Sequence, residues 1–100
     1  MKLTPQALRL ISGLAASYAD RQSLSRWSSW RKRRAGEDVP GDIAQIVLGM
    51  LARHAEHLEQ RIDSAMLTED EEADALNDLG YLRALGSDLK KDAMLREHSA

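Results

Sequence analysis

The chain has 100 residues, of which 43% are hydrophobic, and these values indicate one compact domain rather than two domains or a disordered chain. The absence of Cys excludes disulfides, thiolate metal sites and a cysteine nucleophile, and no apolar run approaches the length of a membrane span. Residues 1–34 carry a net charge of +7 and residues 35–100 a net of −9, which the formal total of −2 conceals. Aromatic and β-branched residues are scarce, so we predict an all-α fold.

The first predicted helix begins at Thr4-Pro5, because Thr caps a helix well and Pro suits the first helical position. Apolar residues recur at three- and four-residue spacing as far as Tyr18. We expect a break within residues 20–23, with Ser23 capping a second, strongly basic helix. Leu24, Trp27 and Trp30 lie roughly along one face of this helix, at a spacing that serves both a buried core and a contact surface. A place in the core is favoured over base contact by Trp.

A loop over residues 35–41 is the clearest break in the chain, because it combines Gly, Pro and acidic residues. The longest helix is predicted to follow it, over about residues 42–66. Its apolar stripe consists of Ile43, Ile46, Val47, Met50, Leu51, Leu58, Ile62 and Met66. Gly49, Ala52 and Ala55 make one side of this helix small, which allows a neighbouring helix to approach closely.

An acidic helical segment is predicted over residues 68–97. Thr68 and Glu71 have the spacing of a capping box, and acids in a first turn complement the helix dipole. Gly80 should weaken this segment, and Gly86-Ser87 could end it and cap a final short helix. The sequence therefore predicts a single helical domain over residues 1–100, with four to five helices.

His54 and His57 form the only constellation with metal-binding character, since two His three residues apart on a helix can point toward one ion. The spacing fits neither the zinc-protease pattern nor the di-iron bundle pattern, so a packed or rim histidine pair is the favoured interpretation. The glycines are scattered singly, and no serine has a recognisable base. We therefore expect a protein that is not an enzyme and has no metal or cofactor.

The candidate partner-binding residues lie in two charged clusters. Two patches of opposite sign can each attract a charged partner, although such runs can also be solvated helix faces or can face each other in the folded monomer or in a head-to-tail dimer. The acidic cluster consists of Glu69, Asp70, Glu71, Glu72, Asp74 and Asp78. The basic cluster consists of Arg26, Trp30, Arg31, Lys32, Arg33 and Arg34.

From Met1-Lys2-Leu3-Thr4-Pro5-Gln6 through the Arg-rich segment to the acidic residues 69–78, the chain resembles the small all-helical phage-encoded anti-CRISPR proteins that inhibit type I-F interference. The resemblance implies binding to protein subunits of a type I CRISPR–Cas surveillance complex in the bacterial cytoplasm, with target DNA kept out. The acidic helix would occupy a Lys/Arg-lined channel in place of phosphates. The basic segment would contact acidic protein surface or the backbone of guide RNA or DNA, and no membrane is involved.

Part of the chain also resembles phage-type helix-turn-helix regulators, over about residues 24–60. The likeness rests on Ser25-Arg26-Trp27 and Trp30, then Gly36, Val39-Pro40 and Ile43-Ala44-Gln45-Ile46. In those regulators a recognition helix ends in Trp and Gly, and a Val-Pro loop leads into a long helix. This resemblance implies a small DNA-binding transcriptional regulator, which is the alternative to the inhibitor.

Overall fold

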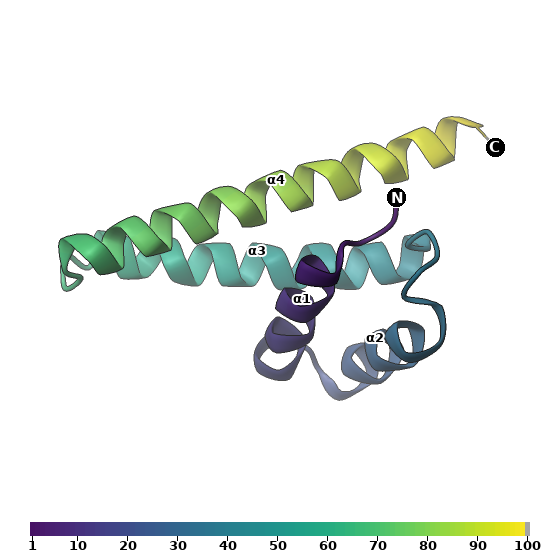
Figure 1. Ribbon diagram of the computed structural model, residues 1–100, viewed down its shortest axis with the longest axis horizontal. Coiled ribbons are helices and arrows are strands. Elements are labelled where there is room, and N and C mark those ends of the chain that lie inside the picture. Colours follow the sequence, from purple (N-terminus) through teal and green to yellow (C-terminus); the bar gives the residue numbers. More distant parts are fainter. Residues whose placement is uncertain (100) are drawn as a thin grey trace.

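The computed structural model describes residues 1–99, with side chains described as far as residue 95. These residues form four helices, namely α1 (Pro5–Tyr18), α2 (Arg21–Arg34), α3 (Gly41–Asp63) and α4 (Glu69–Ser99). The long helices α3 and α4 form an antiparallel hairpin, and α1 and α2 pack on α3 away from the α3–α4 turn (Figure 1). The all-α prediction is confirmed, and the molecule is elongated, with extents of 46 × 29 × 21 Å.

The two N-terminal helices begin at side-chain caps. The hydroxyl of Thr4 accepts the backbone N–H of Ala7 at 3.1 Å, which confirms the predicted start of α1. The expectation that Ser23 caps α2 is wrong, because the cap lies three residues earlier. The cap is Asp20, whose carboxylate accepts the N–H of Ser23 at 2.7 Å, and this hydrogen bond holds the pKa of Asp20 below its ordinary value.

Helix α3 ends at Asp63, three residues before the predicted end. The hydroxyl of Ser64 donates to the carbonyl of Arg61, and Ala65 takes a positive φ of 58°, which a continuing helix does not allow. Met66 was expected to belong to the apolar stripe but is 87% exposed in the turn that follows. The prediction failed because the turn, rather than the periodicity, determines where this helix ends.

Helix α4 is continuous, and no break occurs at Gly86-Ser87. The predicted capping box is present, since Glu71 donates its N–H to the hydroxyl of Thr68 at 3.2 Å and its carboxylate accepts the N–H of Thr68. A helical Gly costs about 1 kcal/mol relative to Ala. Burial along α3 outweighs that cost here, because leucines on both sides of Gly86 lie in the core, at Leu82, Leu85 and Leu89.

The core lies around α3, on which α1, α2 and α4 all pack. Trp27 is 1% exposed and its ring lies 5.6 Å from that of Trp30, which is 7% exposed. The indole N–H of Trp27 donates to the hydroxyl of Ser12 at 3.3 Å, so its polar atom has a partner. Leu24, on the predicted face of both tryptophans, is 38% exposed. The open question of core or contact surface is therefore decided in favour of the core for both tryptophans.

Candidate charged binding surfaces

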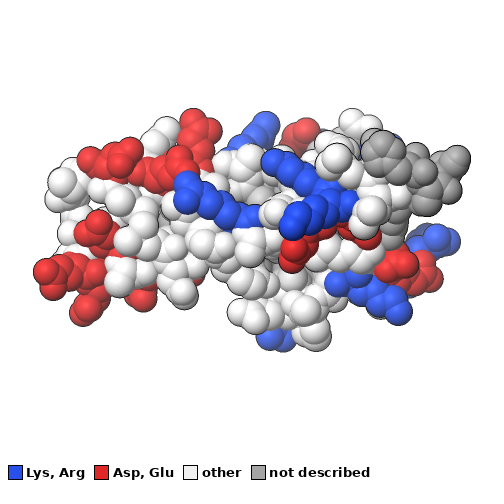
Figure 2. Space-filling model, turned by 90° about the horizontal axis from the view of Figure 1, so that it is seen from above, with Lys and Arg blue, Asp and Glu red and all other residues white. Residues whose placement is uncertain are grey.

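One end of the molecule is strongly acidic, because the hairpin places the C-terminal part of α3 beside the start of α4 (Figures 1 and 2). Residues 56–78 hold nine acids and a single base, Arg61, so their net charge is −8. All nine acids are exposed. We call this surface the acidic end, and it consists of Glu56, Glu59, Asp63, Glu69, Asp70, Glu71, Glu72, Asp74 and Asp78.

The acids of α4 do not all point the same way. Asp70, Asp74 and Asp78 follow one another at four-residue spacing, so they form one stripe along the helix. Glu69 and Glu72 lie on a different side of the helix, and Glu71 takes part in the capping box. The six predicted acids therefore divide into two stripes and one structural residue. The stripe of three aspartates is the larger of the two, and helix capping does not explain its negative charge.

Sequence reasoning missed the acidic residues of α3. Glu56, Glu59 and Asp63 are separated from the α4 cluster by the turn, and only the antiparallel return of the chain brings them to the same end. Two consecutive helices joined by a short turn usually lie antiparallel. The short predicted turn between these helices could therefore have indicated that the acids of α3 lie beside those of α4. Glu59 also receives the guanidinium of Arg83 from α4, which ties the two helices together.

Helix α2 carries six Lys or Arg residues and no acid, a net charge of +6. Part of it forms one wall of a groove of about 470 Å³, which we call the arginine groove. Its lining residues are Ser25, Arg26, Ser29, Trp30, Arg33, Arg34, Pro40, Asp42 and Ile43. Guanidinium and hydroxyl groups donate hydrogen bonds to phosphate or carboxylate oxygens, so this groove can bind an anionic chain.

The basic cluster predicted from the sequence is divided by the fold. Arg26, Arg33 and Arg34 border the arginine groove, whereas Arg31 and Lys32 border a separate depression beside Trp27. Trp30 forms part of the groove wall while remaining almost wholly buried. Trp30 therefore forms part of the floor of the groove and exposes little surface with which a partner could make contact.

The two charged surfaces do not neutralise each other in the monomer. Among the side chains that the structure describes, ion pairs join Arg83 to Glu59 and the N-terminal ammonium to Asp38 and Asp92, and none joins α2 to the acidic end. Figure 1 places α2 at the opposite end of the long axis from the α3–α4 turn. Both surfaces therefore remain available to partners.

Of the predicted histidine pair, His54 is partly buried between α1 and α3, whereas His57 is exposed and stacks on the ring of His54. The hydroxyl of Tyr18 lies 2.9 Å from Nδ1 of His54, and the guanidinium of Arg53 donates to the carbonyl of Tyr18 at 2.9 Å. Burial lowers the pKa of His54, and the charges of His57 and Arg61 lower it further. Within residues 1–95, no three His, Asp or Glu side chains come together as metal ligands would.

Within residues 1–99, no helix combines the length and the apolar character that crossing a membrane requires. Comparisons with protein-family models, with curated proteins and with solved structures found no match to this chain.

Proposed function

We propose that this chain is a non-enzymatic inhibitor that binds a type I CRISPR–Cas surveillance complex and prevents recognition of target DNA. The acidic end is the observation that carries the proposal, since residues 56–78 concentrate a net charge of −8 on exposed side chains. A complex that holds nucleic acid presents Lys/Arg-lined channels to phosphates. Carboxylates spaced along a helix can occupy such a channel and exclude DNA from it.

The shape of the hairpin supports the same proposal. The α3–α4 turn extends beyond α1 and α2, so the acidic end projects from the rest of the molecule (Figure 1). A projecting pair of helices can enter a channel that a globular surface could only cover. The stripe of Asp70, Asp74 and Asp78 adds a linear array of charge along the projecting part, as a nucleic-acid backbone does.

The test is a pair of variants with equal changes of charge. Asp70→Asn with Asp74→Asn removes two charges from the acidic end without touching the capping box of Thr68 and Glu71. Glu37→Gln with Asp88→Asn removes two exposed charges elsewhere. Binding to the purified surveillance complex and inhibition of its DNA binding should weaken in the first variant and persist in the second, with helical circular dichroism unchanged in both. Equal inhibition by the two variants would remove the acidic end from the mechanism.

The arginine groove favours a second candidate, a small DNA-binding regulator that contacts the phosphate backbone through α2. Three arginines and two serines line a single groove, which is suited to phosphate contacts. Under this alternative, Arg26→Ala with Arg33→Ala should abolish a mobility shift on the DNA upstream of the chain's own gene, whereas Arg9→Ala with Arg21→Ala should preserve most of it. Absence of any shift at low salt would exclude the regulator, because phosphate contacts are strongest there.

A further inference from the structure

A second groove, of about 340 Å³, lies between α3 and α4, and no residue of α1 or α2 borders it. Its walls are mainly apolar or small, and its rim on α4 is basic. The walls consist of Leu48, Leu51, Ala52, Ala55, Leu82 and Gly86. Arg83, Ser87, Lys90 and Lys91 form the rim. We call it the hairpin groove.

An exposed stripe runs along α4 past this groove and changes character from one end to the other. Its members recur every three or four residues or after two full turns, so they share one side of the helix. In order they are Glu69, Glu72, Leu76, Arg83, Ser87 and Lys90. Leu76 is 51% exposed and borders a shallow depression shared with α1, so about half of a large apolar side chain faces solvent between an acidic and a basic segment. Figure 2 looks down on α4 and shows the acids gathered toward its start and Lys and Arg over its later part.

We propose that the hairpin groove binds a second copy of this chain, in a two-fold symmetric dimer with the two α4 helices antiparallel. A two-fold axis beside residues 81 and 82 places position 76 of one copy opposite position 87 of the other, and position 72 opposite position 91. Leu76 then enters the hairpin groove of the second copy next to Ala52 and Gly86, while Glu72 meets the basic side chain of Lys91. Both contacts occur twice, as two-fold symmetry requires.

Charge selects this alignment over the parallel one. In a parallel pair the acidic segments would face each other and so would the basic segments, whereas the antiparallel pair sets each acidic segment against a basic one. Arg83 lies near the proposed axis in both copies, but its guanidinium is already paired with Glu59. The stripe from residue 69 to residue 90 is about 32 Å long at 1.5 Å per residue, which gives the two helices an extended line of contact.

Sedimentation equilibrium over a concentration series tests the proposal directly. The unsubstituted chain should associate to dimers, and Leu76→Asp should raise the dissociation constant by roughly tenfold or more, as removal of a central apolar anchor does. Leu24→Asp is the matched control, because Leu24 is a partly exposed leucine on α2, away from the groove. A monomer at every concentration, or equal weakening by both substitutions, would overturn the proposal.

A charge exchange separates this pairing from a general effect of surface charge. Glu72→Lys alone and Lys91→Glu alone should each weaken self-association, because each places like charges opposite one another twice. An equimolar mixture of the two variants should associate again, since in the mixed dimer both pairs are of opposite sign. Failure of the mixture to associate while each variant retains its helical circular dichroism would contradict the alignment.

Cysteine cross-linking fixes the register, because the chain has no Cys of its own. In the proposed dimer the two copies of position 76 lie about 16 Å apart along the helices, as do the two copies of position 87, too far for a disulfide. Leu76→Cys mixed with Ser87→Cys should therefore give a cross-linked dimer under mild oxidation, and neither variant alone should do so. Cross-links within either single variant, or none in the mixture, would overturn the antiparallel pairing.

Discussion

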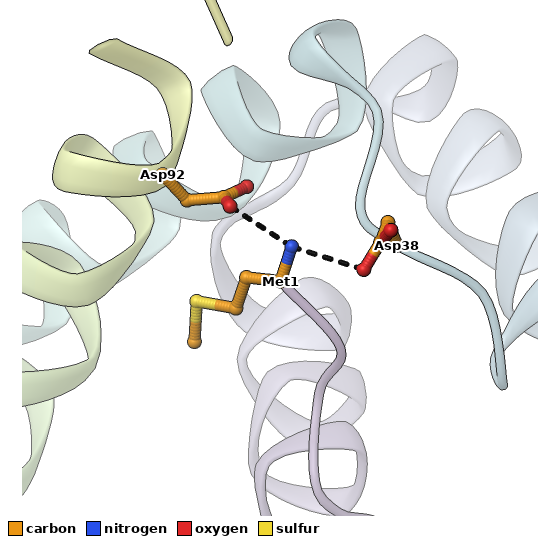
Figure 3. A network of polar contacts seen from close by, with 3 residues as sticks. All are labelled: Met1, Asp38 and Asp92. Atoms are coloured by element: carbon orange, nitrogen blue, oxygen red, sulfur yellow. Dashed lines mark hydrogen bonds and ion pairs between the residues drawn. The ribbon is translucent and has the colours of Figure 1, made fainter. Parts of the chain in front are cut away.

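The α-amino group of Met1 lies 3.0 Å from Oδ1 of Asp92, although the two residues are 91 positions apart in the sequence (Figure 3). The same ammonium lies 3.1 Å from Oδ1 of Asp38. The carbonyl of Met1 also accepts the backbone N–H of Val39 at 2.9 Å. One residue thus connects the loop before α3 with the later part of α4, so the N-terminal segment closes the end of the molecule opposite the acidic end.

Asp92→Asn should lower the free energy of unfolding by about 1 kcal/mol, because it removes the charge of a partly shielded ion pair. Asp92 is 25% exposed, so solvent screens this pair less than a fully exposed one. Asp88→Asn, on an exposed position one turn earlier, should change stability by less than about 0.5 kcal/mol. Urea denaturation at low and high salt measures both, and the difference between the variants should shrink as salt rises. Equal stability of the two variants at low salt would show that the pair contributes nothing.

The lowered pKa of His54 predicts that stability falls in mild acid. The unfolded chain binds this proton near the ordinary value of 6.5, whereas the folded chain binds it only at lower pH. The contribution of His54 is therefore fully present above pH 6.5 and is lost as the pH falls below that value toward the folded pKa. Denaturation at a series of pH values should show this loss in the unsubstituted chain and a smaller one in His54→Gln. An identical pH profile for His54→Gln would exclude His54 as its origin.

Trp27→Ala should destabilise the fold by about 3–5 kcal/mol, the usual cost of removing a large aromatic side chain from a core. Trp27 is 1% exposed, so its removal leaves a buried cavity that solvent does not readily fill. Since a domain of this kind has a total stability of about 5–15 kcal/mol, the variant should melt far below the unsubstituted chain. Leu24→Ala, at a 38% exposed site on the same helix, serves as the control. Similar melting temperatures for the two variants would contradict the core position of Trp27.

Asp20→Ala should increase fraying of the first turn of α2, because the N–H of Ser23 loses its acceptor. Ser23→Ala keeps the backbone N–H that donates to Asp20 and removes only the hydroxyl, which also helps to lower the pKa of Asp20. Hydrogen exchange of the amides of residues 22–24 distinguishes the two variants. Faster exchange in Ser23→Ala than in Asp20→Ala would restore Ser23 as the cap.

Most of the fold is encoded locally, which is why periodicity and caps predicted it. Thr4 and Thr68 both cap the helices that they were expected to start, and apolar spacing identified α3 and α4. The helix ends were harder. Gly86 suggested a break that packing against α3 overrides, and Met66 continued an apolar pattern beyond the turn at Ala65. Both errors arise from tertiary structure, on which local propensity carries no information.

The candidate surfaces were predictable only where their residues are contiguous in the sequence. The acids of residues 69–78 and the bases of residues 31–34 are visible as charge runs. The addition of Glu59 from α3, and the presence of Asp42 in the arginine groove, depend on how the helices are arranged in space. Likewise, the hairpin groove could not be predicted, because its two walls come from separate helices.

The separation of α2 from the acidic end along a molecule 46 Å long gives the monomer a large electric dipole moment, whose component along the long axis is cancelled in an antiparallel dimer. In the electric field of a charged partner such a molecule rotates into a preferred orientation before the two make contact. This orienting effect weakens as salt screens the field. A basic channel draws the acidic end forward, whereas a nucleic acid draws α2 forward. The same chain therefore presents opposite poles to partners of opposite sign, and its orientation on arrival is selected during diffusion rather than at contact.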